Sequence, residues 1–145
     1  MSPAQRLIRL SEGLRLHAYP DPATKGEPYT IGFGRADGTI TPDMTITTET
    51  AEAWLMEDIA KMEAGVLRLV KVPLTDNQVG ALVSFAYNCG LANLKKSTLL
   101  KKVNGGDING AAGEFSRWVT ASGIRLTGLV KRRELERQLF LTPDK

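Results

Sequence analysis

The chain has 145 residues, which suits one domain, undivided or in two lobes, with a sizeable hydrophobic core. Apolar residues make up 42% of it, yet no uninterrupted apolar stretch approaches the roughly 20 residues that cross a bilayer. A single cysteine and a single histidine exclude an internal disulfide and the usual zinc sites, so we expect no metal and no cofactor. The net charge of +3 favours polyanionic partners or simply a solvated basic surface.

The chain opens with the signature of a helix. Ser2 suits the N-cap position, Pro3 the first helical position and Gln5 the third. Gly13 is expected to end this helix directly after Glu12.

The next thirty or so residues, 14–44, predict a small β-containing segment, because short runs alternate with turn residues. Residues 29–34 alternate as a strand does, and Asp37-Gly38 suits a tight turn into Thr39-Ile40.

Helical periodicity dominates the rest of the chain. A long helix is predicted over about residues 48–70, with an apolar stripe at steps of three and four residues. Thr75 and Gln78 form a capping box for a helix that reaches Gly90. Further helices are predicted over residues 97–103, 108–119 and about 128–140.

These elements predict an α+β fold that is mainly α. We expect residues 1–145 to form a single domain with a small β-containing lobe at about 12–46 and a helical lobe at about 74–145. The helix at about 48–70 would join the lobes, and a cleft would lie where they face each other.

Two carboxylates and a threonine in the first 30 residues suggest glycoside cleavage, which needs one carboxyl to protonate the leaving oxygen and another to activate water or attack the sugar. Glu12 lies at the negative end of its helix, where a proton donor is favoured. Asp21, between Pro20 and Pro22, is expected to be solvated and ionised. Taken alone, each of these acids is equally well read as an ordinary surface residue.

Several motifs in order resemble the phage-type lysozymes, the endolysin family. The first runs Glu12-Gly13, Ala18-Tyr19-x-Asp21 and Thr30-Ile31-Gly32-x-Gly34. The second is Leu74-Thr75-x-x-Gln78 with Phe85-x-x-Asn88-x-Gly90, followed by Ser97-Thr98-Leu99, Trp118 and Gly128-Leu129-Val130-x-Arg132-Arg133-x-x-Glu136. Together they span about residues 7–141.

The resemblance implies a lysozyme-like fold and a muramidase, which hydrolyses the β-1,4 bond between N-acetylmuramic acid and N-acetylglucosamine in peptidoglycan and so lyses the host cell. It implies that Glu12 is the acid, that Asp21 is the second carboxylate and that Thr30 helps to hold the attacking water. Tyr87, Asn88 and Ser97 would contact substrate. Arg132 would approach Glu12 or form an ordinary surface salt bridge.

The sequence departs from the family pattern at two places. More residues separate Asp21 from Thr30 than in the pattern, which predicts a bulged loop and makes Glu27 a rival to Asp21. Arg35 follows Gly34 where many members carry a structural histidine, so local stability is affected more than activity.

The family also implies partners and a location. Peptidoglycan is the expected partner, with no nucleic acid and no stable membrane insertion, and the chain is expected to be a monomer. Because its first residues lack the apolar core of a signal peptide, it would stay in the host cytoplasm until a holin opens the inner membrane, and then act on the wall.

Other functions are weighed beside this one. A catalytically inactive lysozyme fold that binds the cell wall is the first alternative, although the intact set of Glu12, Asp21 and Thr30 argues against it. A helical nucleic-acid-binding protein is the second, but its lysines and arginines are spread over separate helices. A transglycosylase, in which a hydroxyl of muramic acid replaces water, remains open.

Overall fold

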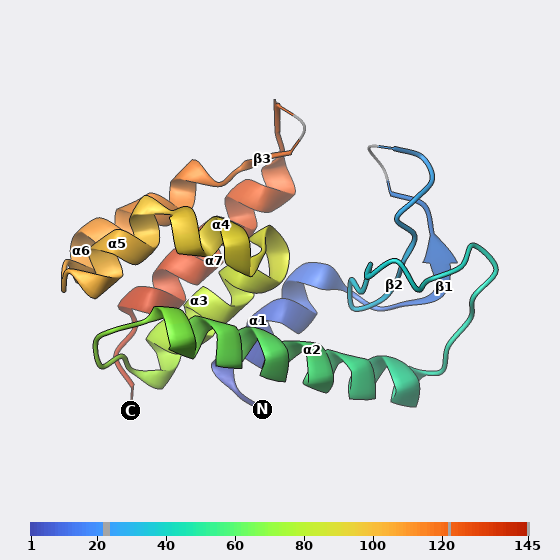
Figure 1. Cartoon of the computed structure of the whole chain (residues 1–145), viewed down its shortest axis with the longest axis horizontal. Coiled ribbons are helices and arrows are strands. Elements are labelled where there is room, and N and C mark those ends of the chain that lie inside the picture. The colour runs from blue at the N-terminus through green and yellow to red at the C-terminus, as the bar shows by residue number, and fades with distance from the viewer. Residues whose placement is uncertain (22–23, 122, 145) are drawn as a thin grey trace. The chain divides into compact units, whose positions relative to one another are not determined.

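The computed structural model describes residues 1–21, 24–121 and 123–144 and forms two compact units (Figure 1). The small unit is Ile8–Asp58, and the helical unit combines Met1–Leu7 with Ile59–Lys145. The boundaries between them fall inside helix α1 (Pro3–Glu12) and helix α2 (Thr48–Leu69). Each of these helices therefore belongs partly to both units.

Helix α1 begins and ends as predicted. The backbone N–H of Gln5 donates to Ser2 Oγ at 3.2 Å, and the Gln5 side chain accepts from the Ser2 N–H at 3.4 Å. These reciprocal bonds satisfy N–H groups that the first helical turn leaves without partners. At the other end, Gly13 adopts a φ of +69°, which lets the chain leave the helix directly after Glu12.

The small unit contains a two-stranded antiparallel sheet of β1 (Arg15–Tyr19) and β2 (Thr30–Gly32). Arg15 pairs with Gly32 and Tyr19 with Thr30, with an irregular register between them. The predicted strand at 29–34 is shorter than expected, because the backbone of Ile31 and Arg35 closes a turn. The buried apolar side chains of this unit are Ile8, Ile31, Phe33, Ile40, Ala51 and Leu55.

The turn predicted at Asp37-Gly38 is present, but no strand follows it. Asp37 Oδ1 accepts a hydrogen bond from the backbone N–H of Thr39 at 3.0 Å, and Gly38 has a φ of +88°. Residues 39 and 40 belong to no strand, although Ile40 is buried. The segment after the turn therefore contributes one apolar side chain to the core without forming a strand.

Helices make up most of the helical unit. After α2 come α3 (Asp76–Cys89), α4 (Leu91–Lys96), α5 (Thr98–Asn104), α6 (Ile108–Glu114), a 3-10 turn η1 (Phe115–Arg117), the short strands β3 (Thr120–Ala121) and β4 (Ile124–Arg125), and α7 (Thr127–Leu141). The predicted capping box at Thr75 is confirmed. The sequence missed α4 and the β3–β4 pair, and it merged α6 and η1 into one helix.

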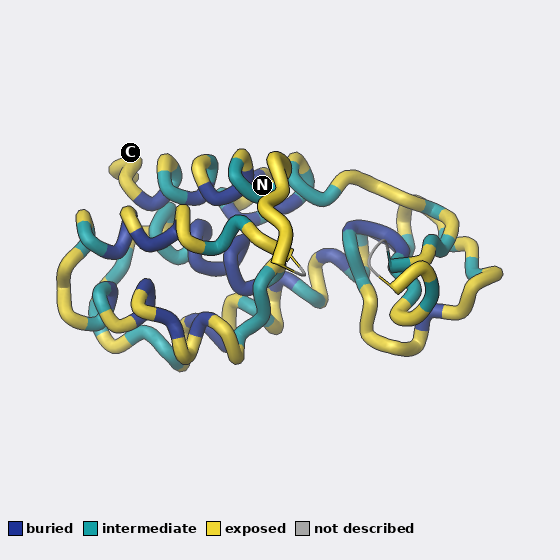
Figure 2. Tube along the Cα trace, turned by 90° about the horizontal axis from the view of Figure 1, so that it is seen from above, coloured by how far each residue is buried: buried dark blue, intermediate teal, exposed yellow. Residues whose placement is uncertain are grey.

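The core of the helical unit lies between α3 and α7, with α5 and α6 packed together beside them. Residues 80–86 of α3 are all buried, and Figure 2 shows buried positions recurring along the helices of this unit. Phe85 and Phe115 meet edge to face with ring centroids 6.0 Å apart, and Phe115 lies 5.5 Å from Phe140. The observed fold is therefore mainly helical with small sheets, as predicted. No helix in the described residues is long and apolar enough to cross a membrane.

Candidate active site

Glu12 is the last residue of α1, and its carboxyl lies against the backbone of Gly34. A Cβ atom on Gly34 would lie 3.0 Å from Glu12 Oε1, closer than nearly all real contacts of such an atom. Gly34 also has a φ of +98°, a conformation that other residues rarely adopt. The glycine therefore lets the chain after β2 pass directly beside the carboxyl.

Tyr19 and Thr30 lie beside Glu12 in the same unit. They face each other across the pair of strands, and their side chains are hydrogen-bonded. Burial raises the pKa of the Tyr19 hydroxyl, and the charge of Glu12 raises it further, which places the two groups within electrostatic reach. Glu12, Thr30 and Gly34 thus form one cluster with Tyr19, which was part of the sequence motif but had been given no role.

Asp21 lies two residues after β1 and anchors a tightly closed loop. Its carboxylate Oδ1 accepts the backbone N–H of Thr24 at 3.2 Å, while its own N–H donates to the Gly26 carbonyl at 3.0 Å. The Thr24 hydroxyl in turn donates to the Glu27 carbonyl at 2.6 Å. The additional residues between Asp21 and Thr30 therefore fold on themselves locally. Pro22, which follows Asp21, lies outside the described residues.

The Glu27 side chain is exposed, whereas Asp21 is half-buried. Because catalysis needs a carboxyl held in a fixed position, this difference favours Asp21 over its rival. Both residues remain candidates for the second carboxylate.

Arg35 holds the glycine-rich turn to α2. Its Nε and Nη2 donate to the two carboxylate oxygens of Asp58 at 3.1 and 2.9 Å, and its guanidinium lies 4.4 Å from the centroid of the Trp54 ring. The bond to Asp58 raises the pKa of Arg35. A paired and stacked arginine thus occupies the place where many family members have a histidine, and it fixes the turn that carries Gly34.

In the helical unit, Asn88 lines a hollow of about 670 Å³ together with Trp118 of the segment after η1. Asn88 is exposed and Tyr87 is half-buried, so the amide in particular is accessible. Ser97 is only 4% exposed, and its hydroxyl donates to the Leu94 carbonyl and accepts the Leu100 N–H. That hydroxyl caps α5, so this placement gives no support to the predicted substrate contact.

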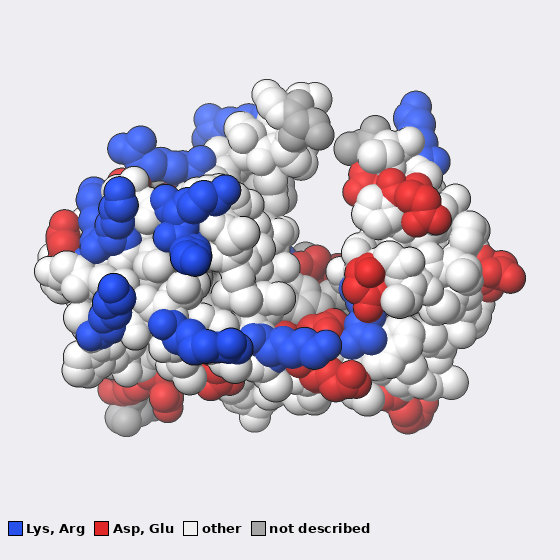
Figure 3. All heavy atoms as spheres, viewed as in Figure 1, with Lys and Arg blue, Asp and Glu red and all other residues white. Residues whose placement is uncertain are grey.

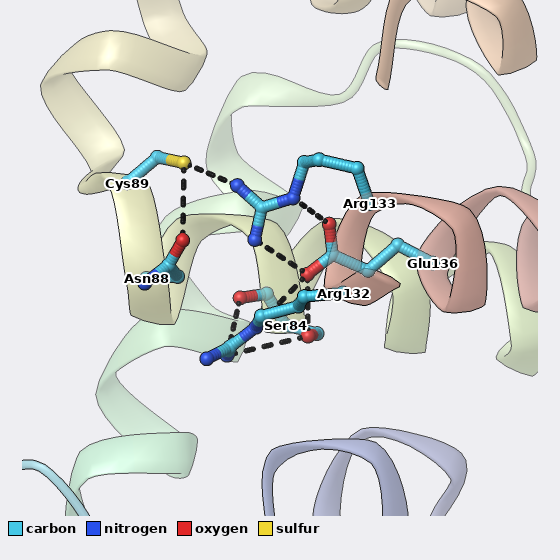
Figure 4. Close-up of polar contacts among 6 residues, drawn as sticks. All are labelled: Ser84, Asn88, Cys89, Arg132, Arg133 and Glu136. Atoms are coloured by element: carbon cyan, nitrogen blue, oxygen red, sulfur yellow. Dashed lines mark hydrogen bonds and ion pairs between the residues drawn. The ribbon is translucent and has the colours of Figure 1, made fainter. Parts of the chain in front are cut away.

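A buried ionic network crosses the middle of this unit (Figure 4). Glu136 is completely buried and lies 2.7 Å from Arg133 Nε and 3.4 Å from Arg132 Nε, and its Oε2 accepts the Ser84 hydroxyl at 2.6 Å. Burial raises the pKa of Glu136, while the two guanidinium groups and the hydroxyl oppose that rise. Arg132 is 5% exposed, so the predicted surface salt bridge is wrong; its approach to Glu12 stays a prediction.

Cys89 joins the same network, because Arg133 Nη1 donates to its sulfur at 2.7 Å. Burial raises the pKa of this thiol, so the reactive thiolate is disfavoured. Among the residues that the structure describes, no group of three or more His, Cys, Asp and Glu side chains is placed to hold a metal ion.

Comparison with known proteins gives one consistent result. The family model described as phage lysozyme matches residues 9–136. An endolysin of Acyrthosiphon pisum secondary endosymbiont phage 1 is 46% identical over 92% of this chain and 92% of its own length. An endolysin of Bacillus phage B103 is 48% identical over 95% of this chain.

The chain spans only 52% of the length of that Bacillus phage relative. Among solved structures, the muramidase domain of SpmX from Asticaccaulis excentricus is similar, with a TM-score of 0.87 and 37% identity. The similarity covers 97% of this chain and 95% of that domain.

Proposed function

Because the chain belongs to the phage lysozyme family, we propose that it is an endolysin muramidase acting on bacterial peptidoglycan. It would hydrolyse the β-1,4 bond between N-acetylmuramic acid and N-acetylglucosamine and so lyse the host. The observation that carries this proposal is the Glu12 carboxyl held against Gly34 beside Tyr19 and Thr30, with Asp21 anchored on the adjoining loop. Its relatives are named endolysins, and a structural neighbour is named a muramidase domain.

The proposed reaction follows from the chemistry of the two carboxyls. Glu12 gives its proton to the glycosidic oxygen, which leaves as a hydroxyl on the N-acetylglucosamine. A water molecule then forms the new bond to the anomeric carbon of muramic acid and loses its proton to Asp21. Thr30 helps to hold that water, and the hydrogen bond to Tyr19 fixes the orientation of the Thr30 hydroxyl. We expect inversion, with the water on the face opposite to Glu12.

Mass spectrometry of digested peptidoglycan tests this proposal against its alternatives. Hydrolysis adds one water and leaves muramic acid with a reducing end. Anhydro ends without the added water would identify a transglycosylase instead. A protein that sediments with the wall but releases no fragments would be the inactive wall binder.

We further propose that the chain reaches the wall through a membrane hole made by a holin, as expected from the sequence. Expression of this chain alone in a Gram-negative host should cause little lysis until the inner membrane is permeabilised with a solvent. The optical density of the culture measures this directly. Prompt lysis without permeabilisation would show that the chain has its own export route.

A further inference from the structure

A basic hollow of about 590 Å³ lies in the helical unit, and none of the residues assigned to catalysis is among the described residues that line it. Four cationic residues line it: Arg68 in the last turn of α2, Lys71 two residues after that helix, Lys95 in α4 and Lys101 in α5. Apolar lining comes from Leu69 and Leu100. Figure 3 shows Lys and Arg side chains gathered on this face of the helical unit.

Within the described residues, the four cations of the basic hollow have no acidic partner. No acidic residue lines the hollow, and within the described part of the chain none of the four forms an ion pair. Neighbouring Lys102 differs, because it reaches Glu114 at 3.3 Å. Four like charges around one concavity repel one another unless an anion enters it.

Helix geometry explains part of this arrangement but not all of it. Helices α2, α4 and α5 end at Leu69, Lys96 and Asn104, and a cation at the negative end of a helix gains about 0.3–1 kcal/mol. That gain explains why a single cation is favoured near each helix end, whichever side of the helix the cation occupies. It does not require all four to line the same hollow without an acid among them.

The rim of the basic hollow is also built rigidly. The side-chain oxygen of Asn104 accepts the Lys71 N–H at 2.7 Å, and its amide nitrogen donates to the Leu69 carbonyl at 3.0 Å. These bonds tie the end of α2 to the end of α5. The backbone near Arg68, Lys71 and Lys101 is therefore held in place before any ligand binds, which lowers the entropic cost of binding.

We propose that the basic hollow binds the phosphate groups of a repeating envelope polyanion, and this inference rests on the proposed action at the cell wall. A single phosphate carries at most two charges, so it would leave the four cations partly unneutralised, whereas successive phosphates of one polymer match them. Lysine and arginine are the side chains that bind phosphate best. Binding of the polyanion at the basic hollow, in addition to binding of peptidoglycan at the active site, would hold the enzyme at the wall and raise the local concentration of its substrate.

The lining favours this class of ligand over single-stranded nucleic acid. Proteins that bind single strands stack the bases on aromatic side chains, and none of the described residues that line the hollow is aromatic. Phosphates on polyol polymers of the wall and on envelope lipids share the same chemistry, and an experiment can separate these two sources.

Two triple variants with equal net charge test the proposal. The hollow variant is Lys71→Gln, Lys95→Gln and Lys101→Gln, and the control is Arg6→Gln, Lys61→Gln and Lys131→Gln. All six residues are exposed, so both variants should fold, and thermal unfolding verifies this. The probes are poly(glycerol phosphate), phosphatidylglycerol vesicles and duplex DNA, each at about 0.15 M salt.

We expect the hollow variant to bind its phosphate probe at least about tenfold more weakly than the wild type, and the control to lose far less. Loss with poly(glycerol phosphate) supports the repeating polyanion. Loss confined to vesicles would overturn it and identify a lipid headgroup as the ligand. Equal losses in both variants would overturn the proposal, because net charge alone would explain them. Tighter binding of DNA than of either other probe would also overturn it. Since binding is measured without catalysis, failure of the muramidase proposal gives a separate result.

Discussion

The two units use glutamate and arginine in opposite ways. In the helical unit, Glu136 is completely buried between Arg132 and Arg133, and the network holds α7 against α3. In the small unit, Glu12 is the last residue of α1, and its carboxyl lies against the backbone of Gly34. Arg35 holds the turn that carries Gly34 through its bond to Asp58. Burial and backbone geometry, more than residue type, therefore separate a structural carboxyl from a candidate acid. Substitutions in the two units should accordingly affect different properties.

Within the loop between β1 and β2, the substitution with the largest effect on the hydrolysis rate should be that of Asp21, the candidate second carboxylate. Asp21→Asn removes the acceptor for the proton of water, so the hydrolysis rate should fall by about 10²–10⁴-fold. Glu27→Gln, a few residues away on an exposed side chain, should leave most of the rate. Reducing-end release from purified peptidoglycan measures both. If the two variants exchange these outcomes, Glu27 is the second carboxylate.

The matching change in the helical unit should destabilise the protein. Glu136→Gln leaves two buried guanidinium groups without their carboxylate, which typically costs about 3–5 kcal/mol. Chemical denaturation should show this loss in the free energy of unfolding, whereas Glu134→Gln on the exposed face of α7 should change it little. An unchanged unfolding curve for Glu136→Gln would mean that the network contributes nothing to the helical unit.

Two glycines with similar backbone conformations isolate the contact at Glu12. Gly34→Ala and Gly38→Ala both force an alanine into a left-handed conformation and should each cost about 1–2 kcal/mol of stability. Only Gly34 is close to the Glu12 carboxyl, since a Cβ on Gly38 would have nothing within 4 Å. Only Gly34→Ala should therefore displace the acid and lower the rate, by about tenfold or more. Equal rates for the two variants would remove Gly34 from the site.

The smallest expected effect concerns pH. Arg35→His places a group with a pKa near about 6.5 beside Asp58, so the ion pair would exist at low pH and be lost as pH rises through the raised pKa of that histidine. Unfolding midpoints at about pH 5.5 and about pH 8.5 should show a deficit against the wild type that is larger at high pH, equivalent to about 1 kcal/mol. Arg137→His, in the exposed pair with Glu134, serves as control. A deficit independent of pH would show that stacking on Trp54, and not the ion pair, carries the stability.

Local signals in the sequence predicted much of the fold. The helix-capping motifs at Ser2 and Thr75 each involve two residues three positions apart, and Gly13 ends the helix that directly precedes it. These signals can therefore be recognised in the sequence without knowledge of distant contacts. The apolar stripe along α2 was likewise predicted from spacing. Four of its six residues are buried, Ala51, Leu55, Ile59 and Val66, whereas Met62 and Leu69 are half-buried.

The missed features depend on contacts between distant residues. Helix α4 is six residues long, too short for a periodic pattern, and its Leu94 is buried by its neighbours. Nothing local in the segment around Glu136 shows that it meets Ser84 on α3. The residues of the candidate site were found in the sequence because the family resemblance supplied their roles.

The central claim is that Glu12 supplies the proton, and one substitution tests it most directly. Glu12→Gln keeps the shape of the side chain but cannot donate a proton to the glycosidic oxygen. The rate of reducing-end release from peptidoglycan should fall by at least about 10²-fold, while the unfolding midpoint stays close to that of the wild type. A Glu12→Gln protein that keeps its fold and most of its hydrolytic rate would contradict this account.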